Sequence, residues 1–110
     1  MIFDSNDGTT IVFQEKANLS LFLRNLKDNY SQIKNDNIVV NLFSFSKLKA
    51  DDVLEFLQIS DTHKKSGKSF VLVTDKVAYD EVPDEICLVP TIQEAHDIIE
   101  MEEIERDLDL

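Results

Sequence analysis

A polar loop between two apolar segments carries the side chains best suited to chemistry in this chain. Residues 38–43 and 69–74 are almost continuously apolar, as is typical of strands buried on both faces of a sheet. In a strand–helix–strand unit, the loop after the first strand usually holds the working residues. We therefore expect a partner-binding surface built from two serines, two lysines and two aspartates: Ser44, Ser46, Lys47, Lys49, Asp51 and Asp52.

The residues of this loop do not by themselves define a reaction. The loop contains no histidine or cysteine, and the whole chain has two glycines, too few for a loop that cradles phosphate. His63 and His96 fall on different predicted helices, and we expect His96 to be a partly buried structural residue. Cys87 lies among apolar neighbours and is expected to be a buried strand residue without a reactive thiol. We expect no catalytic residues, no metal site and no cofactor.

The charge of the chain is concentrated in its last third. Residues 75–110 hold 13 acidic and 2 basic side chains, whereas residues 1–74 hold 9 of each, so the net charge of −11 belongs to the C-terminal part. Nucleic acids and anionic membranes both bind through cationic groups, and so we exclude them as partners. The acidic end could steer a basic protein partner, or it could simply be a solvated helix.

Length and apolar pattern indicate one domain covering residues 1–110. The single cysteine excludes an internal disulfide, no apolar run is long enough to span a membrane, and the first residues do not read as a secretory signal. We therefore expect a cytoplasmic protein.

The first half of the chain predicts a hairpin and a helix. Residues 1–4 and 10–14 flank a turn segment that contains the Asp7-Gly8 pair, a strong hairpin signal. Asn18 is placed to cap a helix of about four turns, with Asn35 near its end. Apolar residues repeat along one face of that helix: Leu19, Phe22, Leu23, Leu26, Tyr30 and Ile33.

The second half predicts two more helices and a short strand. One helix should run from near Ala50 to Gly67, and a strand should cover residues 86–89 after a loop or short helical turn. Thr91 and Glu94 have the spacing of a capping box at the start of the last helix. Its inner face is expected to be Ile92, Ala95 and Ile99. From about residue 100 we expect an acidic helical extension, with a sparse apolar line on a different face: Ile98, Met101, Ile104 and Leu108.

With this order of elements, the chain resembles a STAS domain, the fold of bacterial anti-sigma factor antagonists. The segment Val39-Val40-Asn41-Leu42 is similar to the family's V-x-D-L strand, residues 49–53 stand where the family has D-S-S-G-L, and Glu94-Ala95 matches an E-A pair in the last helix. The resemblance implies an α/β fold with a mixed, mostly parallel sheet and packed helices. It also implies a protein partner, such as a regulatory kinase-like protein.

The family's phosphorylated serine has no counterpart in this alignment. Ala50 occupies its position, Asp51 follows, and Asp52 replaces the glycine. Ser44 or Ser46 could take the role only if the register shifts by several residues. Asp51 could mimic a phosphorylated state, and an ordinary carboxylate at the front of a helix explains it equally well.

The chain also resembles short bacterial proteins that are sometimes named ribonuclease Z, notably across residues 90–108. Such a nuclease is a zinc enzyme with an H-x-H-x-D-H cluster. His63 and His96, as isolated histidines, cannot furnish a di-zinc site of that kind. We interpret the name as one borrowed from a genomic neighbour.

Three hypotheses about function follow. The first is a non-enzymatic interaction module of STAS type that docks a protein on the 44–52 edge without a phosphorylatable serine. The second is a small-molecule binder or small enzyme that uses the same edge. The third is self-association, with a homodimer formed through the last helix.

Overall fold

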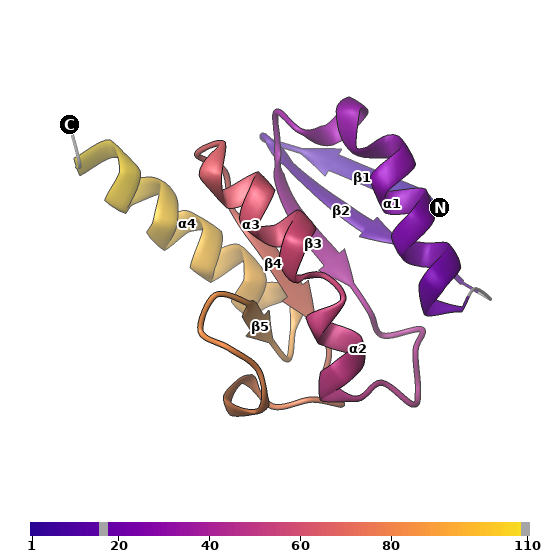
Figure 1. Cartoon of the computed structure of the whole chain (residues 1–110). Helices are drawn as coiled ribbons and strands as arrows, with labels where there is room; N and C mark the ends of the chain where they lie inside the picture. The colour runs from indigo at the N-terminus through magenta and orange to yellow at the C-terminus, as the bar shows by residue number, and fades with distance from the viewer. Residues whose placement is uncertain (16–17, 109–110) are drawn as a thin grey trace.

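A five-stranded mixed sheet organises the part of the chain that the computed structural model describes, residues 1–15 and 18–108. The strands lie in chain order across the sheet (Figure 1). The elements, in order, are β1 (Ile2–Asn6), β2 (Thr9–Phe13), α1 (Leu19–Ile33), β3 (Asn37–Asn41), α2 (Ala50–Leu54), α3 (Leu57–Lys65), β4 (Phe70–Val73), the 3-10 turn η1 (Tyr79–Glu81), β5 (Cys87–Val89) and α4 (Ile92–Leu108).

The pairing of the strands confirms the predicted α/β fold. β1 and β2 are antiparallel, while β2, β3, β4 and β5 are mutually parallel. Asp7 and Gly8 form the hairpin turn with positive φ angles of 52° and 80°, as a tight hairpin requires. The strands begin and end within a few residues of the predicted bounds.

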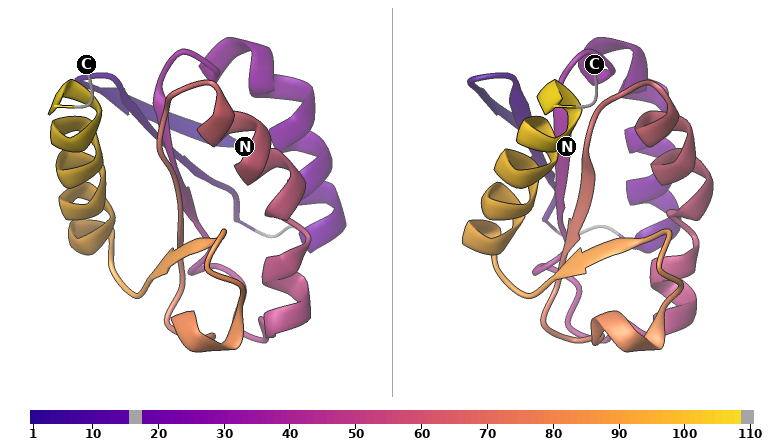
Figure 2. Two further views of the ribbon diagram at one scale, coloured as in Figure 1. Left: turned by 60° about the vertical axis from the view of Figure 1, so that its left-hand side comes forward. Right: turned by 90° about the vertical axis from the view of Figure 1, so that its left-hand side faces the viewer.

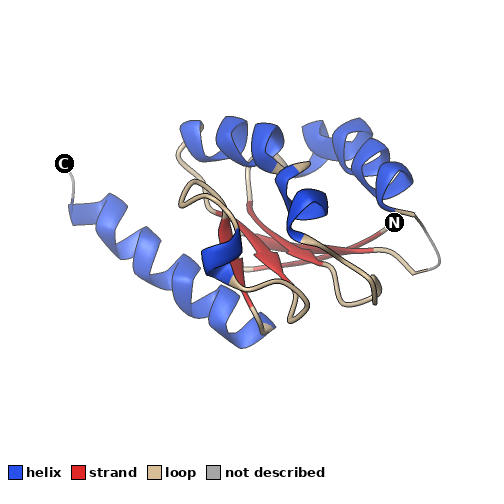
Figure 3. Cartoon of the chain, turned by 60° about the horizontal axis from the view of Figure 1, so that its bottom comes forward, coloured by secondary structure: helices blue, strands red, loops and turns tan. Residues whose placement is uncertain are grey.

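Helices cover both faces of the sheet, so it forms the middle of three layers. Helices α1, α2 and α3 lie on one face and α4 lies alone on the other (Figures 2 and 3). Alternate strand residues serve the two faces, because successive side chains of a strand point in opposite directions. Val40 and Leu72 join the core beneath α1 and α3, whereas Val39 and Val71 pack with Ala95 of α4.

Helix α1 forms as its pattern predicts. The Asn18 side chain accepts a hydrogen bond from the Leu21 backbone N–H at 2.8 Å and so caps the helix. Phe22 and Leu26 are fully buried against the sheet. The capping interaction at α4 is also present, with the Glu94 N–H donating to Thr91 Oγ1 at 3.1 Å.

The predicted single helix from Ala50 to Gly67 is wrong, because the structure has two helices there. The backbone N–H groups of Glu55 and Phe56 donate to carbonyl groups three residues earlier, Asp52 and Val53, which tightens the chain and ends α2. Phe56 is fully buried and packs edge-on against Phe22, with ring centroids 6.1 Å apart. The break contains neither Pro nor Gly, so no local sequence signal predicts it.

Gly67 ends α3 as predicted. It has a φ of 90°, a conformation that glycine adopts without strain, and its N–H donates to the Lys64 carbonyl at 3.0 Å. Helix α4 buries Ala95 and Ile99 as expected, with Ile92 packed beside them. Ile98, expected on the outer apolar line, is half-buried and packs against the same core, whereas Met101, Ile104 and Leu108 are exposed. Division of the chain into a domain body and an acidic extension from about residue 100 stays a prediction. No helix among the described residues is long and apolar enough to cross a membrane.

Candidate functional site

The six predicted partner-binding residues lie at the carboxyl ends of the parallel strands. Five of them are exposed and Asp52 is half-buried. Two apolar side chains between them hold the loop in place: Leu48 is buried, and the Phe45 ring packs edge-on against Phe22 with centroids 5.5 Å apart. The loop is therefore anchored to the core while its polar side chains face outward.

Side-chain hydrogen bonds fix the C-terminal end of β3 and the loop that follows it. The Phe43 N–H donates to Asn41 Oδ1 at 3.0 Å, and this bond turns the chain out of the strand. The Ser44 hydroxyl donates to the Gln14 carbonyl at 2.8 Å and ties the loop to the segment after β2. The role of Asn41 is not visible in the sequence, where it simply stands in the place of the family's aspartate.

At the front of α2, the two aspartates have different roles. Asp52 Oδ2 accepts a hydrogen bond from the Lys49 N–H at 2.9 Å, which stabilises the start of the helix. Asp51 is exposed in the first turn. Ala50 begins the helix, so this position offers no hydroxyl group.

Two hollows open at this edge of the sheet. The smaller, of about 300 Å³, is lined by four of the six predicted residues together with three apolar ones: Ser44, Ser46, Lys47, Asp52, Leu19, Phe45 and Leu48. Lys49 and Asp51 do not line it. The larger, of about 470 Å³, lies between the loop after β4 and the end of β5, and exposed Tyr79 is on its wall. Phe43, 45% exposed, adds apolar surface to the same edge.

His63 is a buried structural residue with both ring nitrogens engaged. It is 0% exposed, and Nε2 lies 2.8 Å from the Asp36 carbonyl, to which it donates. Nδ1 lies 2.7 Å from the Tyr30 hydroxyl, which donates to it in the neutral ring. Burial lowers the pKa of His63, partly offset by its bond to the Asp36 backbone. Sequence reasoning missed this role, because its partners lie 27 and 33 residues away.

The other residues whose side chains could take part in a reaction or bind a metal lie apart from one another. The expectation for His96 is wrong: it is exposed, because it falls outside the narrow buried face of α4. Cys87 is half-buried on β5, where burial raises the pKa of its thiol and the charge of Glu102 raises it further. Within residues 1–15 and 18–108, no three His, Cys, Asp or Glu side chains are grouped so that they could hold a metal ion.

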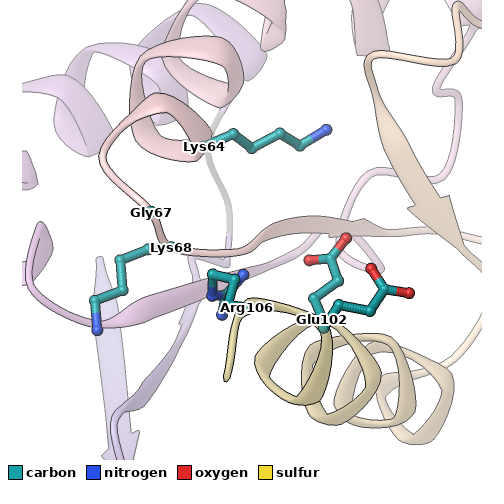
Figure 4. A pocket seen from close by; sticks show the side chains of 6 residues that line it. Lys64, Gly67, Lys68, Glu102 and Arg106 are labelled. Atoms are coloured by element: carbon teal, nitrogen blue, oxygen red, sulfur yellow. The ribbon is translucent and has the colours of Figure 1, made fainter. Parts of the chain in front are cut away.

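A third hollow, of about 350 Å³, lies at the opposite edge of the sheet. Figure 4 shows Lys64 and Lys68 on one side of it and Glu102 and Arg106 of α4 on the other. Glu102 accepts a hydrogen bond from the Ser69 hydroxyl and Arg106 donates to the same oxygen, so two of these side chains are already engaged in holding α4 to the sheet. We assign this cluster to the attachment of α4.

Comparison with known proteins identifies the fold. No protein-family model matches the chain, and no curated protein matches it in sequence. The NMR structure of the protein TM1081 is similar to it with a TM-score of 0.63 and 19% identity, over 89% of this chain and 86% of that one. RsbS from Moorella thermoacetica, in a variant with glutamate in place of a serine, is similar with a TM-score of 0.59 and 14% identity, over 89% and 95%.

These similarities show that the chain has a STAS-like fold. They confirm the architecture expected from the resemblance. The name ribonuclease Z finds no support in them.

Proposed function

We propose that the protein is a non-enzymatic interaction module that docks a protein partner on the 44–52 edge, in the manner of an anti-sigma factor antagonist. The observation that carries the proposal is the loop itself. Phe45 and Leu48 pack against the core and hold the loop in place, while Ser46, Lys47 and Lys49 are exposed beside a shallow hollow. A preformed surface of this kind loses little conformational entropy when it binds a partner.

The absence of a hydroxyl at the front of α2 supports binding that does not depend on phosphorylation there. Ala50 and Asp51 occupy the first positions of the helix. The similar RsbS structure carries glutamate in place of a serine, and Asp51 offers this protein a carboxylate without any modification. We propose that docking here is constitutive.

The docking surface is tested by reversing charge at exposed residues whose side chains make no hydrogen bond within the described part of the chain. Lys47→Glu, Lys49→Glu and Asp51→Lys should abolish capture of the partner while leaving the thermal melt nearly unchanged. Asp52 is not used, because its bond to the Lys49 N–H would be lost, at a cost of about 1 kcal/mol. Purified tagged protein would be used to capture partners from a lysate, with identification by mass spectrometry.

A control reverses two lysines near the other edge. The substitutions are Lys34→Glu and Lys65→Glu. Both lysines are exposed and lie away from the 44–52 loop, at the ends of α1 and α3. The expected partners are the proteins that wild type and this control capture but the variant with Lys47→Glu, Lys49→Glu and Asp51→Lys does not. If the substitutions in the 44–52 loop leave capture unaffected, the docking surface is elsewhere.

Small-molecule binding is the second candidate, and the hollow of about 470 Å³ beside Tyr79 favours it. Its size suits a small ligand, and ligands of α/β sheets bind at the carboxyl ends of the strands. Screening by NMR would show shifts confined to residues 74–81 and 88–90 if this candidate is right. If shifts there saturate with ligand, and the variant with Lys47→Glu, Lys49→Glu and Asp51→Lys loses no partner, the protein is a ligand-binding domain and the interaction-module proposal is wrong.

A further inference from the structure

The C-terminal half of α4 is held to the sheet by hydrogen bonds in place of apolar packing. Glu102 Oε1 accepts from the Ser69 hydroxyl and Glu103 Oε1 accepts from Asn37 Nδ2, both at 2.6 Å. Arg106 donates to Ser69 Oγ at 3.2 Å and to Asn37 Oδ1 at 3.4 Å. These bonds fix which side of the helix faces the sheet.

The opposite side of the same turns carries an apolar row that is exposed to solvent. Met101, Ile104 and Leu108 are spaced by three and four residues, which places them on one face, and they are 50%, 54% and 79% exposed. This face lies opposite the side whose residues bond to Asn37 and Ser69, so it is turned away from the sheet. Figure 2 shows that α4 lies alone on its side of the sheet. The folded chain therefore presents three large apolar side chains in register on a fixed helix.

Carboxylates surround this apolar row. Asp97, Glu100, Glu105 and Asp107 are all exposed, and each lies three or four residues from a member of the row. Within the described part of the chain, Arg106 is the one Lys or Arg residue after Lys76. Its guanidinium group already donates hydrogen bonds to Ser69 and Asn37. Glu105 and Asp107 line hollows that Lys68 also lines, but none of the four carboxylates forms a salt bridge within the described residues. The row is thus flanked by acidic side chains that are free to pair with a cationic partner.

Two of these acids stand at positions that do not favour the stability of α4. Carboxylates near a helix C-terminus interact unfavourably with the helix dipole. Glu105 and Asp107 stand in the last turn of α4, where cationic side chains would be stabilising. A bound cationic partner would compensate both the dipole and the carboxylates.

We propose that the outer face of α4 is a second docking surface, whose occupant is a basic amphipathic helix of another protein. The apolar row would pack against the partner's apolar stripe, and the carboxylates would pair with flanking Lys or Arg residues. A second copy of this chain does not fit, because its α4 would bring carboxylates against carboxylates. The surface is separate from the 44–52 edge and does not depend on the function proposed for that edge.

The probe is a synthetic amphipathic peptide of about four helical turns, with leucines on one face and flanking lysines. We expect one peptide to bind per chain, measured by calorimetry. Met101→Ser with Ile104→Ser should weaken binding at least about tenfold, since large apolar side chains can no longer be buried. Leu21→Ser is the matched control, because Leu21 is 42% exposed on α1, and it should leave affinity unchanged.

Two further comparisons separate this proposal from general charge attraction and from the other surface. A peptide of the same composition with its leucine row scrambled should bind at least about tenfold more weakly, and the variant with Lys47→Glu and Lys49→Glu should bind the ordered peptide as wild type does. Equal binding of ordered and scrambled peptides would overturn the proposal, as would equal binding by the Met101 and Ile104 variant. A stable dimer in sedimentation, dissociated by Leu108→Ser, would also overturn it and assign the face to self-association.

Discussion

At the scale of single residues, His63 couples the stability of the fold to pH. Its ring is fully buried between Tyr30, Phe70 and the Asp36 carbonyl, with no water-exposed surface for a charged imidazolium. Desolvation is the largest effect on its pKa and lowers it, the bond to the Asp36 backbone raises it, and the charge of Lys68 lowers it. The unfolded chain therefore binds the proton at a higher pH than the folded chain does.

We predict that the free energy of unfolding declines as pH falls through the unfolded histidine pKa of about 6.5, and that this contribution ends below the folded pKa. The slope from His63 is at most about 1.4 kcal/mol per pH unit. Urea unfolding of wild type and of His63→Gln, between about pH 7 and pH 5, measures it. The variant should be less stable at neutral pH and should show a flatter profile.

The control for this prediction is His96→Gln, because His96 is exposed on α4. It should retain the wild-type slope. Identical slopes for wild type and His63→Gln would show that the buried ring does not lose stability through protonation in this range.

At the scale of elements, the attachment of α4 depends on Asn37. This side chain is 3% exposed, its Oδ1 accepts from the Ser69 N–H at 2.9 Å, and its amide also bonds Glu103 and Arg106. One residue at the start of β3 therefore joins β4 and the last turns of α4. The sequence prediction of an acidic extension considered apolar packing alone and did not include these polar contacts.

We predict that Asn37→Ala lowers the free energy of unfolding by about 1–3 kcal/mol, because it leaves the buried Ser69 N–H without an acceptor. Ile104→Ser should change stability by no more than about 0.5 kcal/mol, since the side chain is already exposed. Chemical unfolding of both variants provides the measurement. A larger loss for Ile104→Ser than for Asn37→Ala would mean that apolar contacts hold the helix.

At the scale of the whole molecule, the distribution of potential ligands argues against a zinc nuclease. His63 uses both nitrogens inside the core, His96 is exposed on a different helix, and Cys87 is half-buried on β5. We predict that the purified protein carries no stoichiometric zinc and does not cleave RNA. Elemental analysis and an RNA cleavage assay test this. Bound zinc together with cleavage that chelation abolishes would contradict it.

The sequence by itself determined the mostly parallel sheet and the order of the elements, apart from the division of the predicted 50–67 helix into α2 and α3. Continuous apolar segments predict strands buried on both faces, and Asn18, Asp7-Gly8 and Thr91 are local signals that depend on residues within a few positions. The carboxyl-edge loop also follows from this order, because parallel strands place the loops that follow them at one edge. Its use as a docking surface stays a proposal.

Only the tertiary structure decided the features that join distant segments. The bonds of His63 to Tyr30 and of Asn37 to Glu103 connect residues 33 and 66 positions apart, and no periodicity or spacing along the chain contains such pairs. The break between α2 and α3 is of the same kind, since it accompanies burial of Phe56 against Phe22 of another helix. Local signals report local free energies, whereas these contacts exist only once packing has brought the segments together.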